Sequence, residues 1–348
     1  MNGISALQFA LCHFNYYCSE FLKLRDSKKI QFTHNDIGSL IHKIFQHFLI
    51  LEGSEGKEYT SEELMEIITR LTDEYTDALC GIHGISNKMK HYFSRLKSTI
   101  CVFVEALLKE KRASNFTPEF FELKIHGDNS PLQLELPVDD NHTAVIRGYV
   151  DRVDVCRVAS QRDDGTVDEE NSTTYVKILD YKTGSHIFKR ARLEKGLDMQ
   201  MLIYLLALTQ MKDSYFKEKL LGGMKNLKPA GVTYLTYKVN KTDVGCEVDF
   251  SSSEVIAEEK NAIEEKISRS GIALADPYLM PTDKQFNLSK PSYVSKDEFD
   301  VIFDQVKASI SSLALKMLSG AAYAEPLKGE NPCRYCKNKA ICRRKETL

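Results

Sequence analysis

Charged residues inside two strand-like segments constrain the fold of this chain more than any other feature. In ILDYKTG, Asp180 and Lys182 are two residues apart, so strand alternation places both side chains on one face of a sheet. In GYVDRVDV, Asp151 and Asp154 interrupt a run that is otherwise rich in valine. Burying such groups is costly unless they pair with one another or bind a metal ion.

Two interpretations of these charges are open. An ion pair, Asp180 with Lys182 or Asp154 with Arg152, is the simpler explanation of any single motif. The combination of both segments favours a catalytic site, because carboxylates on adjacent strands can hold Mg²⁺ while a lysine orients or activates a water molecule. Phosphodiester hydrolysis needs these groups, since the metal polarises the phosphoryl oxygen and positive charge stabilises the transition state.

The periodicity of the chain predicts a helical block followed by a sheet. From residue 4 to about 113 the apolar residues recur at helical spacing and proline is absent. Alternation and β-branched residues predict four strands, over residues 132–138, 143–158, 174–181 and 231–239. Further helices are predicted over residues 193–212, 253–269 and 295–319, and a solvated hairpin loop over residues 159–173.

Polar residues on two predicted helices are additional candidates for the site. His42 lies on a different stripe from the apolar face of its helix, and Gly38, one turn earlier, leaves room for another element to approach. A lone histidine in a helix is more often a surface or core residue than a ligand. Gln200 and Tyr204 are spaced i,i+4 and share a helical face, either as a polar rim or as a pair that reaches the metal site and a DNA phosphate.

Composition narrows the class of protein. The chain has 348 residues, of which 43% are hydrophobic and 28% charged, which excludes disordered and collagen-like proteins. A formal net charge of -2 means that any DNA contact must come from a local concentration of Lys and Arg. We find no signal peptide and no apolar run of the ~18 residues that span a bilayer, so we expect a cytoplasmic protein.

The motifs occur in an order that is found in a known family. They are G-x-x-x-H, E-L, GYVDRVD, LDYKTG and Q-x-x-x-Y, which begin at residues 38, 122, 148, 179 and 200. This set resembles the RecB-like nucleases of the PD-(D/E)xK superfamily. The resemblance implies an α/β fold with a restriction-endonuclease-like mixed β-sheet flanked by helices, an N-terminal helical block and a C-terminal iron–sulfur module.

The resemblance also implies a role for most motif residues. His42, Asp151 and Asp180 would bind Mg²⁺ or Mn²⁺, with a contribution from the main-chain carbonyl of Tyr181, and Lys182 would be the catalytic lysine.

Two further motifs follow from the same resemblance. Gln200 and Tyr204 match the motif that follows the lysine strand in these nucleases and complete the expected catalytic set. Glu122 matches an acidic position of the nearest relatives, and its role stays open. The sequence departs from the family at Gln46, where a glutamate often follows the histidine by four residues.

Nine cysteines, an odd number, are present, and three of them form a C-x2-C-x5-C run in the tail: Cys333, Cys336 and Cys342. Three thiolates need a fourth ligand, and zinc is the usual metal for an isolated C-x2-C. The resemblance instead implies a structural 4Fe–4S cluster whose fourth ligand is Cys12. Cys18 and His13 are the alternatives, although Cys18 is about a turn and a half further on and is expected to face elsewhere.

The same tail concentrates positive charge. It is either a solvated tail or a patch that contacts phosphates, and its candidate DNA-binding residues are Arg334, Lys337, Lys339, Arg343 and Arg344. We divide the chain into a helical block at residues 1–116, a nuclease core at 117–250, and C-terminal helices with the cysteine tail at 251–348.

The resemblance covers nearly the whole chain and favours the C-terminal nuclease region of AddB-type proteins. It implies a DNA exonuclease domain that cuts single strands in a complex with an AddA-type helicase-nuclease partner, for processing of double-strand breaks. A helicase-like region would then lie before residue 1. The alternatives are a stand-alone CRISPR-associated exonuclease and a non-catalytic DNA-binding scaffold with the nuclease fold.

Overall fold

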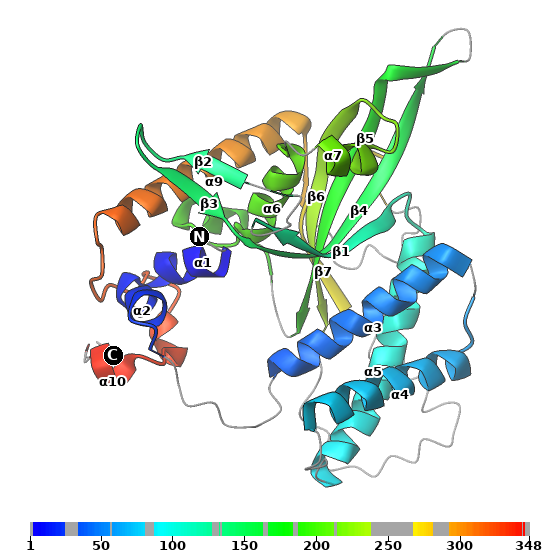
Figure 1. Cartoon of the computed structure of the whole chain (residues 1–348), viewed down its shortest axis with the longest axis horizontal. Helices are drawn as coiled ribbons and strands as arrows, with labels where there is room; N and C mark the ends of the chain where they lie inside the picture. Colours follow the sequence, from blue (N-terminus) through cyan, green and yellow to red (C-terminus); the bar gives the residue numbers. More distant parts are fainter. Residues whose placement is uncertain are drawn as a thin grey trace.

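The computed structural model describes most of the chain, in the following stretches: residues 3–24, 34–55, 58–80, 87–126, 132, 134–162, 166–183, 187–211, 214–237, 267–280, 292–342 and 344. Within them, a six-stranded mixed sheet has helices on both faces (Figure 1). Its strands, in spatial order, are β1 (Thr117–Ile125), β4 (Gly148–Gln161), β5 (Val167–Thr183), β6 (Asn226–Tyr237), β7 (Ile267–Leu274) and β8 (Ser292–Val294). The β5–β6 and β7–β8 pairs are parallel, and the other neighbouring strands are antiparallel.

The predicted strand over residues 143–158 is divided between two sheets. Its first part, β3 (Thr143–Ile146), pairs with β2 (Leu134–Pro137), whereas β4 belongs to the large sheet. The predicted loop over residues 159–173 is shorter than expected, because β4 and β5 continue to pair as far as Gln161 and Val167. Backbone hydrogen bonds between the two strands hold this polar part of the hairpin together, although it has no apolar face to bury. It projects away from the core (Figure 1).

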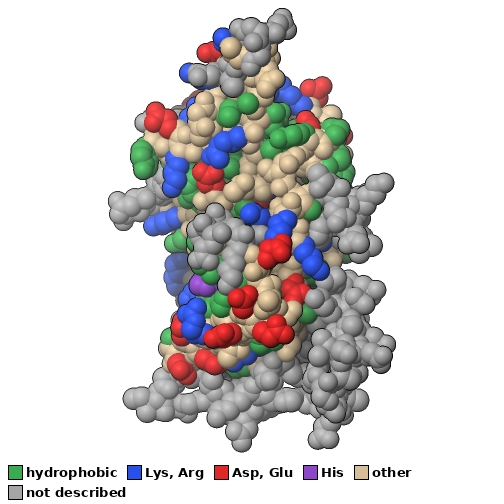
Figure 2. Space-filling model, turned by 90° about the vertical axis from the view of Figure 1, so that its right-hand side faces the viewer, with side chains coloured by type: hydrophobic (Ala, Val, Ile, Leu, Met, Phe, Trp, Pro, Cys, Tyr) green, Lys and Arg blue, Asp and Glu red, His purple; other side chains and the backbone are tan. Residues whose placement is uncertain are grey.

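Alternation along the strands divides the core into two layers. On one face, Tyr181 and Leu235 pack against the helical block, which contains α3 (His34–Glu55), α4 (Ser61–Cys80) and α5 (Asn87–Arg112). On the other face, Ile178 and Val232 share a core with three further helices: α1 (Gly3–Leu11), α6 (Gln200–Thr209) and α9 (Lys296–Leu318). The side of the molecule that Figure 2 views carries a concentration of acidic side chains in its lower part, over the helical block.

Two predicted helices differ from the structure. The helix predicted over residues 193–212 is a 3₁₀ helix at Arg190–Lys195 followed by α6, and Gly196, with a φ of 74°, ends the first piece in the left-handed region. The end of the helix predicted over 253–269 is wrong, since residues 267–269 begin β7; residues 253–266 lie outside the described stretches. Pairing with β6 determines the conformation of β7, because strand propensity depends on its neighbours.

The two ends of the described chain form one module. The short elements α2 (His13–Tyr16), η1 (Tyr17–Phe21), η5 (Pro332–Tyr335) and α10 (Lys339–Cys342) lie together at the left of Figure 1. Backbone hydrogen bonds join Leu327 N to Leu11 O at 2.8 Å and Phe14 N to Tyr323 O at 3.2 Å. None of the described helices has the length and apolar character to cross a membrane.

Candidate active site

A group of potential metal ligands forms where the strands β1, β4 and β5 meet α3. His42, Glu122 and Asp151 each offer a ligand atom, and these atoms all lie within 4.8 Å of one another. His42 Nδ1 is 3.6 Å from Asp151 Oδ2 and 3.7 Å from Glu122 Oε1. In the part of the chain that the structure describes, this is the one group of three such residues.

The backbone at Glu122 is unusual for a strand. Its φ is 48°, in the left-handed region, although its neighbours Phe121 and Leu123 pair normally with β4. This conformation costs a residue with a side chain about 1–2 kcal/mol, so the surrounding ladder must impose it. The carboxylate of Glu122, whose role the sequence leaves open, thereby lies beside His42.

Tyr181 links two members of the group through its main chain. Its N–H donates to Asp151 Oδ2 at 3.1 Å, and its carbonyl oxygen is 3.2 Å from His42 Nε2. With Nε2–H donated to this carbonyl, Nδ1 faces the two carboxylates as an acceptor. Histidines that bind metals commonly donate their second ring nitrogen in this way.

The electrostatics of the group fit a bound cation. Burial, together with the negative charge of Asp180, raises the pKa of Asp151 to about 6, against the charge of His42. Burial alone would lower the pKa of His42, but Glu122, Asp151 and the Tyr181 carbonyl outweigh it and raise the pKa. Two carboxylates and an imidazole are ligands that a divalent cation such as Mg²⁺ or Mn²⁺ can take, and the positive charge of such an ion would favour the ionised form of Asp151.

Asp180 and Lys182 lie next to this group but contact each other. Lys182 Nζ is 2.7 Å from Asp180 Oδ2, and Asp180 is only 4% exposed. Arg152 pairs with Leu179 across the antiparallel strands β4 and β5. Asp151 comes just before Arg152 and Asp180 just after Leu179, so the same register places the two aspartates opposite each other. Asp180 is not among the three residues whose ligand atoms lie within 4.8 Å.

The motif residues Gln200 and Tyr204 lie on α6, on the core side of the sheet. Gln200 Nε2 donates to Tyr204 Oη at 3.3 Å, and Tyr204 is 2% exposed, so its hydroxyl lies in the core and not at the surface. Tyr204 packs against Gly148, three residues before Asp151. Gly38 leaves open space, as expected: apart from its own helix backbone, none of the described atoms lies within 4 Å of its Cβ position, and no described element fills the space.

The four predicted cluster cysteines lie in the module that joins the chain ends, and all are half-buried: Cys12, Cys333, Cys336 and Cys342. No three of their sulfur atoms lie within 4.8 Å of one another, so in the described residues they do not form a closed site for a single ion. Cys336 Sγ contacts Asn15 Oδ1 at 3.5 Å.

Cys18 and His13, the alternatives to Cys12 as the fourth ligand, have different surroundings. Cys18 is fully buried, and its pKa is raised by burial and then by the thiols of Cys336, Cys342 and Cys12. Cys18 is therefore near enough to the other thiols for them to act on its pKa, and which cysteine is the fourth ligand stays a prediction. The His13 ring packs between the aromatic rings of Phe9 and Tyr323, at 4.3 and 4.7 Å between centroids.

The basic residues predicted to contact DNA are exposed where they are described: Arg334, Lys337, Lys339 and Arg344. Arg343 lies outside the described residues. Arg344 donates a hydrogen bond to the Ala324 carbonyl, which orients it along the tail.

A known family matches almost the whole chain. Residues 5–343 match the PD-(D/E)XK nuclease superfamily. The chain belongs to this superfamily. The sequence resemblance is thereby confirmed, and a mixed sheet flanked by helices, with the potential metal ligands on α3, β1 and β4, fits the nuclease fold.

Curated relatives share one description, as a subunit of an "ATP-dependent helicase/deoxyribonuclease". The protein so described from Clostridium kluyveri is 28% identical over 98% of this chain and 30% of its own length. Those from Clostridium acetobutylicum and Alkaliphilus metalliredigens are 26% and 25% identical, over 95% and 98% of this chain and 28% and 30% of their own lengths. The chain therefore spans less than a third of the length of these relatives.

Proposed function

We propose that this chain is a metal-dependent deoxyribonuclease domain that acts as an exonuclease on single-stranded DNA. The observation that carries the proposal is the group of His42, Glu122 and Asp151 beside the Asp180–Lys182 pair. Mg²⁺ or Mn²⁺ bound there would polarise the scissile phosphate and lower the pKa of the attacking water.

The residues of this chain divide the remaining tasks. The proposed metal ligands are His42, Asp151 and Asp180. Glu122 adds a further carboxylate, and the main-chain carbonyl oxygen of Tyr181 is the last proposed metal ligand. The 36% exposed side chain of Lys182 reaches the solvent side of the site, where its ammonium group can orient water and stabilise negative charge on the phosphate. Asp180 holds this ammonium group in place at 2.7 Å.

A cluster of the 4Fe–4S type is proposed at the joined ends of the chain. Each thiolate of such a cluster binds a different iron, so the sulfur atoms lie farther apart than the ligands of one ion. The burial of Cys18 beside Cys12, Cys336 and Cys342 supports a site rich in thiols. Anaerobic purification should give a coloured protein, and Cys342→Ser should bleach it, whereas a colourless protein with stoichiometric zinc would contradict the cluster.

The names of the relatives support a wider context. They are described as subunits of helicase/deoxyribonucleases, so we place this domain in the cytoplasm with an AddA-type partner, in the processing of DNA ends for recombinational repair. The exposed basic residues of the C-terminal tail are the proposed phosphate contacts, because Lys and Arg neutralise the charge of DNA phosphates.

The central experiment tests cleavage of end-labelled single-stranded DNA with and without Mg²⁺. Lys182→Ala and Asp180→Ala should abolish cleavage, while Lys189→Ala, which removes an exposed lysine outside the site, should leave it intact. Circular dichroism must show that all variants fold. Cleavage retained by Lys182→Ala would contradict the site assignment, and a folded wild type that binds DNA without cutting it would indicate a scaffold.

A further inference from the structure

A buried ion pair lies on the opposite face of β4 from Val153 and Val155, which belong to the core shared with α6. Arg152 and Asp154 are 5% and 1% exposed, and two parallel hydrogen bonds of 2.6 Å join them, from Nε to Oδ1 and from Nη2 to Oδ2. Such pairs contribute little net stability, because the cost of desolvating both charges offsets their attraction. A contribution to stability therefore does not explain why these two charges are buried.

A third nitrogen of the Arg152 guanidinium group, Nη1, suggests another role for the pair. Arg152 Nη1 donates to the hydroxyl of Tyr181 at 2.9 Å. Burial raises the pKa of Tyr181 to about 12, although Arg152 lowers it, so the hydroxyl stays protonated at neutral pH. The ring of Tyr181 packs against His42 and Phe45, at 5.3 and 5.0 Å between ring centroids. Its side chain is therefore held at both the ring and the hydroxyl.

The main chain of the same residue contacts two members of the ligand group. Tyr181 N donates to Asp151, and its carbonyl faces His42 Nε2. A shift of the Tyr181 ring that carries its Cα along would move the peptide groups on both sides of this residue. The orientation of two potential ligands thus depends on a tyrosine that Arg152 holds in place.

We propose that Arg152, oriented by Asp154, is a positioning residue for the metal centre and acts through Tyr181. The inference rests on the proposed function, since it concerns the affinity of the site for its metal. Replacing the hydrogen-bond partners behind metal ligands commonly weakens metal binding by 10–100-fold, about the range expected here.

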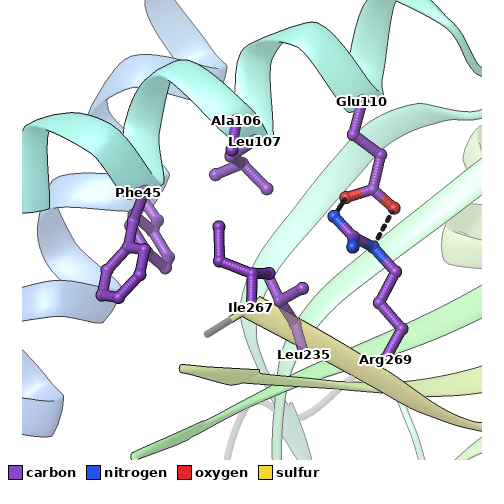
Figure 3. A pocket seen from close by; sticks show the side chains of 8 residues that line it. Phe45, Ala106, Leu107, Glu110, Leu235, Ile267 and Arg269 are labelled. Carbon is purple, nitrogen blue, oxygen red and sulfur yellow. Dashed lines mark hydrogen bonds and ion pairs between the residues drawn. The ribbon is translucent and has the colours of Figure 1, made fainter. Parts of the chain in front are cut away.

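A second buried pair provides a matched comparison. Arg269 on β7 donates to Glu110 on α5 from Nε at 2.9 Å and from Nη2 at 2.7 Å, again as two parallel bonds (Figure 3). It lies beside a small cavity of about 10 Å³ whose lining includes Ile267 and Leu235. The pair has the same chemistry as Arg152 and Asp154 and is near enough for the charge of Arg152 to act on the pKa of Glu110, but it joins α5 to β7 and its two parallel bonds do not involve Tyr181.

The test measures binding of Mn²⁺ alone to the 348-residue chain by electron paramagnetic resonance of the free ion. Tyr181→Phe removes only the hydroxyl, and we expect its Kd for Mn²⁺ to rise by about tenfold or more. Tyr175→Phe, the same change on the same strand, should leave the Kd unchanged. Unchanged affinity in Tyr181→Phe would overturn the positioning role.

A pair of double variants tests the arginine itself. Arg152→Met with Asp154→Leu replaces the first ion pair by apolar groups and should weaken Mn²⁺ binding, whereas Arg269→Met with Glu110→Leu should not. Equal affinities of the two folded double variants would also overturn the role; if the first does not fold, Tyr181→Phe decides alone.

Cleavage separates this inference from the proposed function. At saturating Mn²⁺, Tyr181→Phe should regain near wild-type cleavage of single-stranded DNA, because only metal affinity is affected. If the wild type neither binds Mn²⁺ nor cleaves, the proposed function fails. If the wild type does both and Tyr181→Phe binds Mn²⁺ equally well, only the positioning role fails.

Discussion

Replacing Gly148 by alanine should destabilise the protein through a single steric conflict. A Cβ atom at this position would lie 2.0 Å from Tyr204 Oη, 2.6 Å from Cζ and 2.9 Å from Cε1. Tyr204 cannot swing into solvent, because residues of the central core surround it. Either the ring or the start of β4 must therefore move.

The size of the effect follows from two opposing contributions. Overpacking a well-packed core costs about 1–3 kcal/mol. Alanine also restricts the unfolded chain, which stabilises the protein by about 0.4–1 kcal/mol where the backbone accepts it. We therefore expect Gly148→Ala to lower the free energy of unfolding by roughly 1–2 kcal/mol, measured by urea denaturation followed by circular dichroism in EDTA.

Two further variants isolate the steric cause. Gly38→Ala is the same substitution inside the helix α3, where none of the described atoms lies within 4 Å of the new Cβ, so it should raise the stability by about 0.5–1 kcal/mol. In Gly148→Ala with Tyr204→Phe, the nearest atom is gone and part of the loss should be recovered. A Gly148→Ala protein as stable as the wild type, or no recovery in the double variant, would refute this explanation.

Three other predictions follow from the site and the tail. Glu122→Gly and Glu122→Ala both remove the carboxylate, but a φ of 48° favours glycine, so the glycine variant should be more stable in urea by about 1 kcal/mol; equal stabilities would contradict the left-handed backbone. In EDTA, Asp151→Asn should be more stable than the wild type at pH 8. The reason is that a folded-state pKa raised from 3.8 to about 6 means that the folded protein disfavours the ionised form, by at most about 3 kcal/mol above that pKa. This advantage should shrink as the pH falls toward 4, and a growing advantage would show the opposite sign. Finally, Lys337→Ser and Lys339→Ser should each lower the slope of log affinity for single-stranded DNA against log salt by about 0.7, and an unchanged slope would exclude these residues as phosphate contacts.

Alternation and residue type were sufficient to predict part of the candidate site. They place Asp180 and Lys182 on one face, and the structure pairs them at 2.7 Å. They also identify β4 as a strand that carries Asp151. Both ion pairs of the simpler interpretation form, Arg152 with Asp154 and Lys182 with Asp180. The catalytic interpretation of the same strands stays a prediction.

Other features depend on conformations that residue type does not indicate. Glutamate has no preference for positive φ, so nothing in the local sequence predicts the backbone that brings Glu122 to His42. Cys18 lies in a π-helix, Tyr17–Phe21, whose wider turns change the direction of the side chains relative to an α-helix, and no residue type in this segment indicates that change.

The hydrogen bond between α1 and the segment around residue 327 has a consequence for folding. Phe9 is buried in the central core, and the carbonyl of Leu11 accepts its hydrogen bond from the N–H of Leu327, so α1 finds this partner about 300 residues further along the chain. Closing a loop of about 300 residues costs roughly 5 kcal/mol of chain entropy, which the completed core must offset. During synthesis, α1 therefore lacks this bond until residue 327 has been added. A ribosome stalled before residue 327 would carry a nascent chain whose α1 is not fixed by this bond, and protease digestion of such a chain would reveal it.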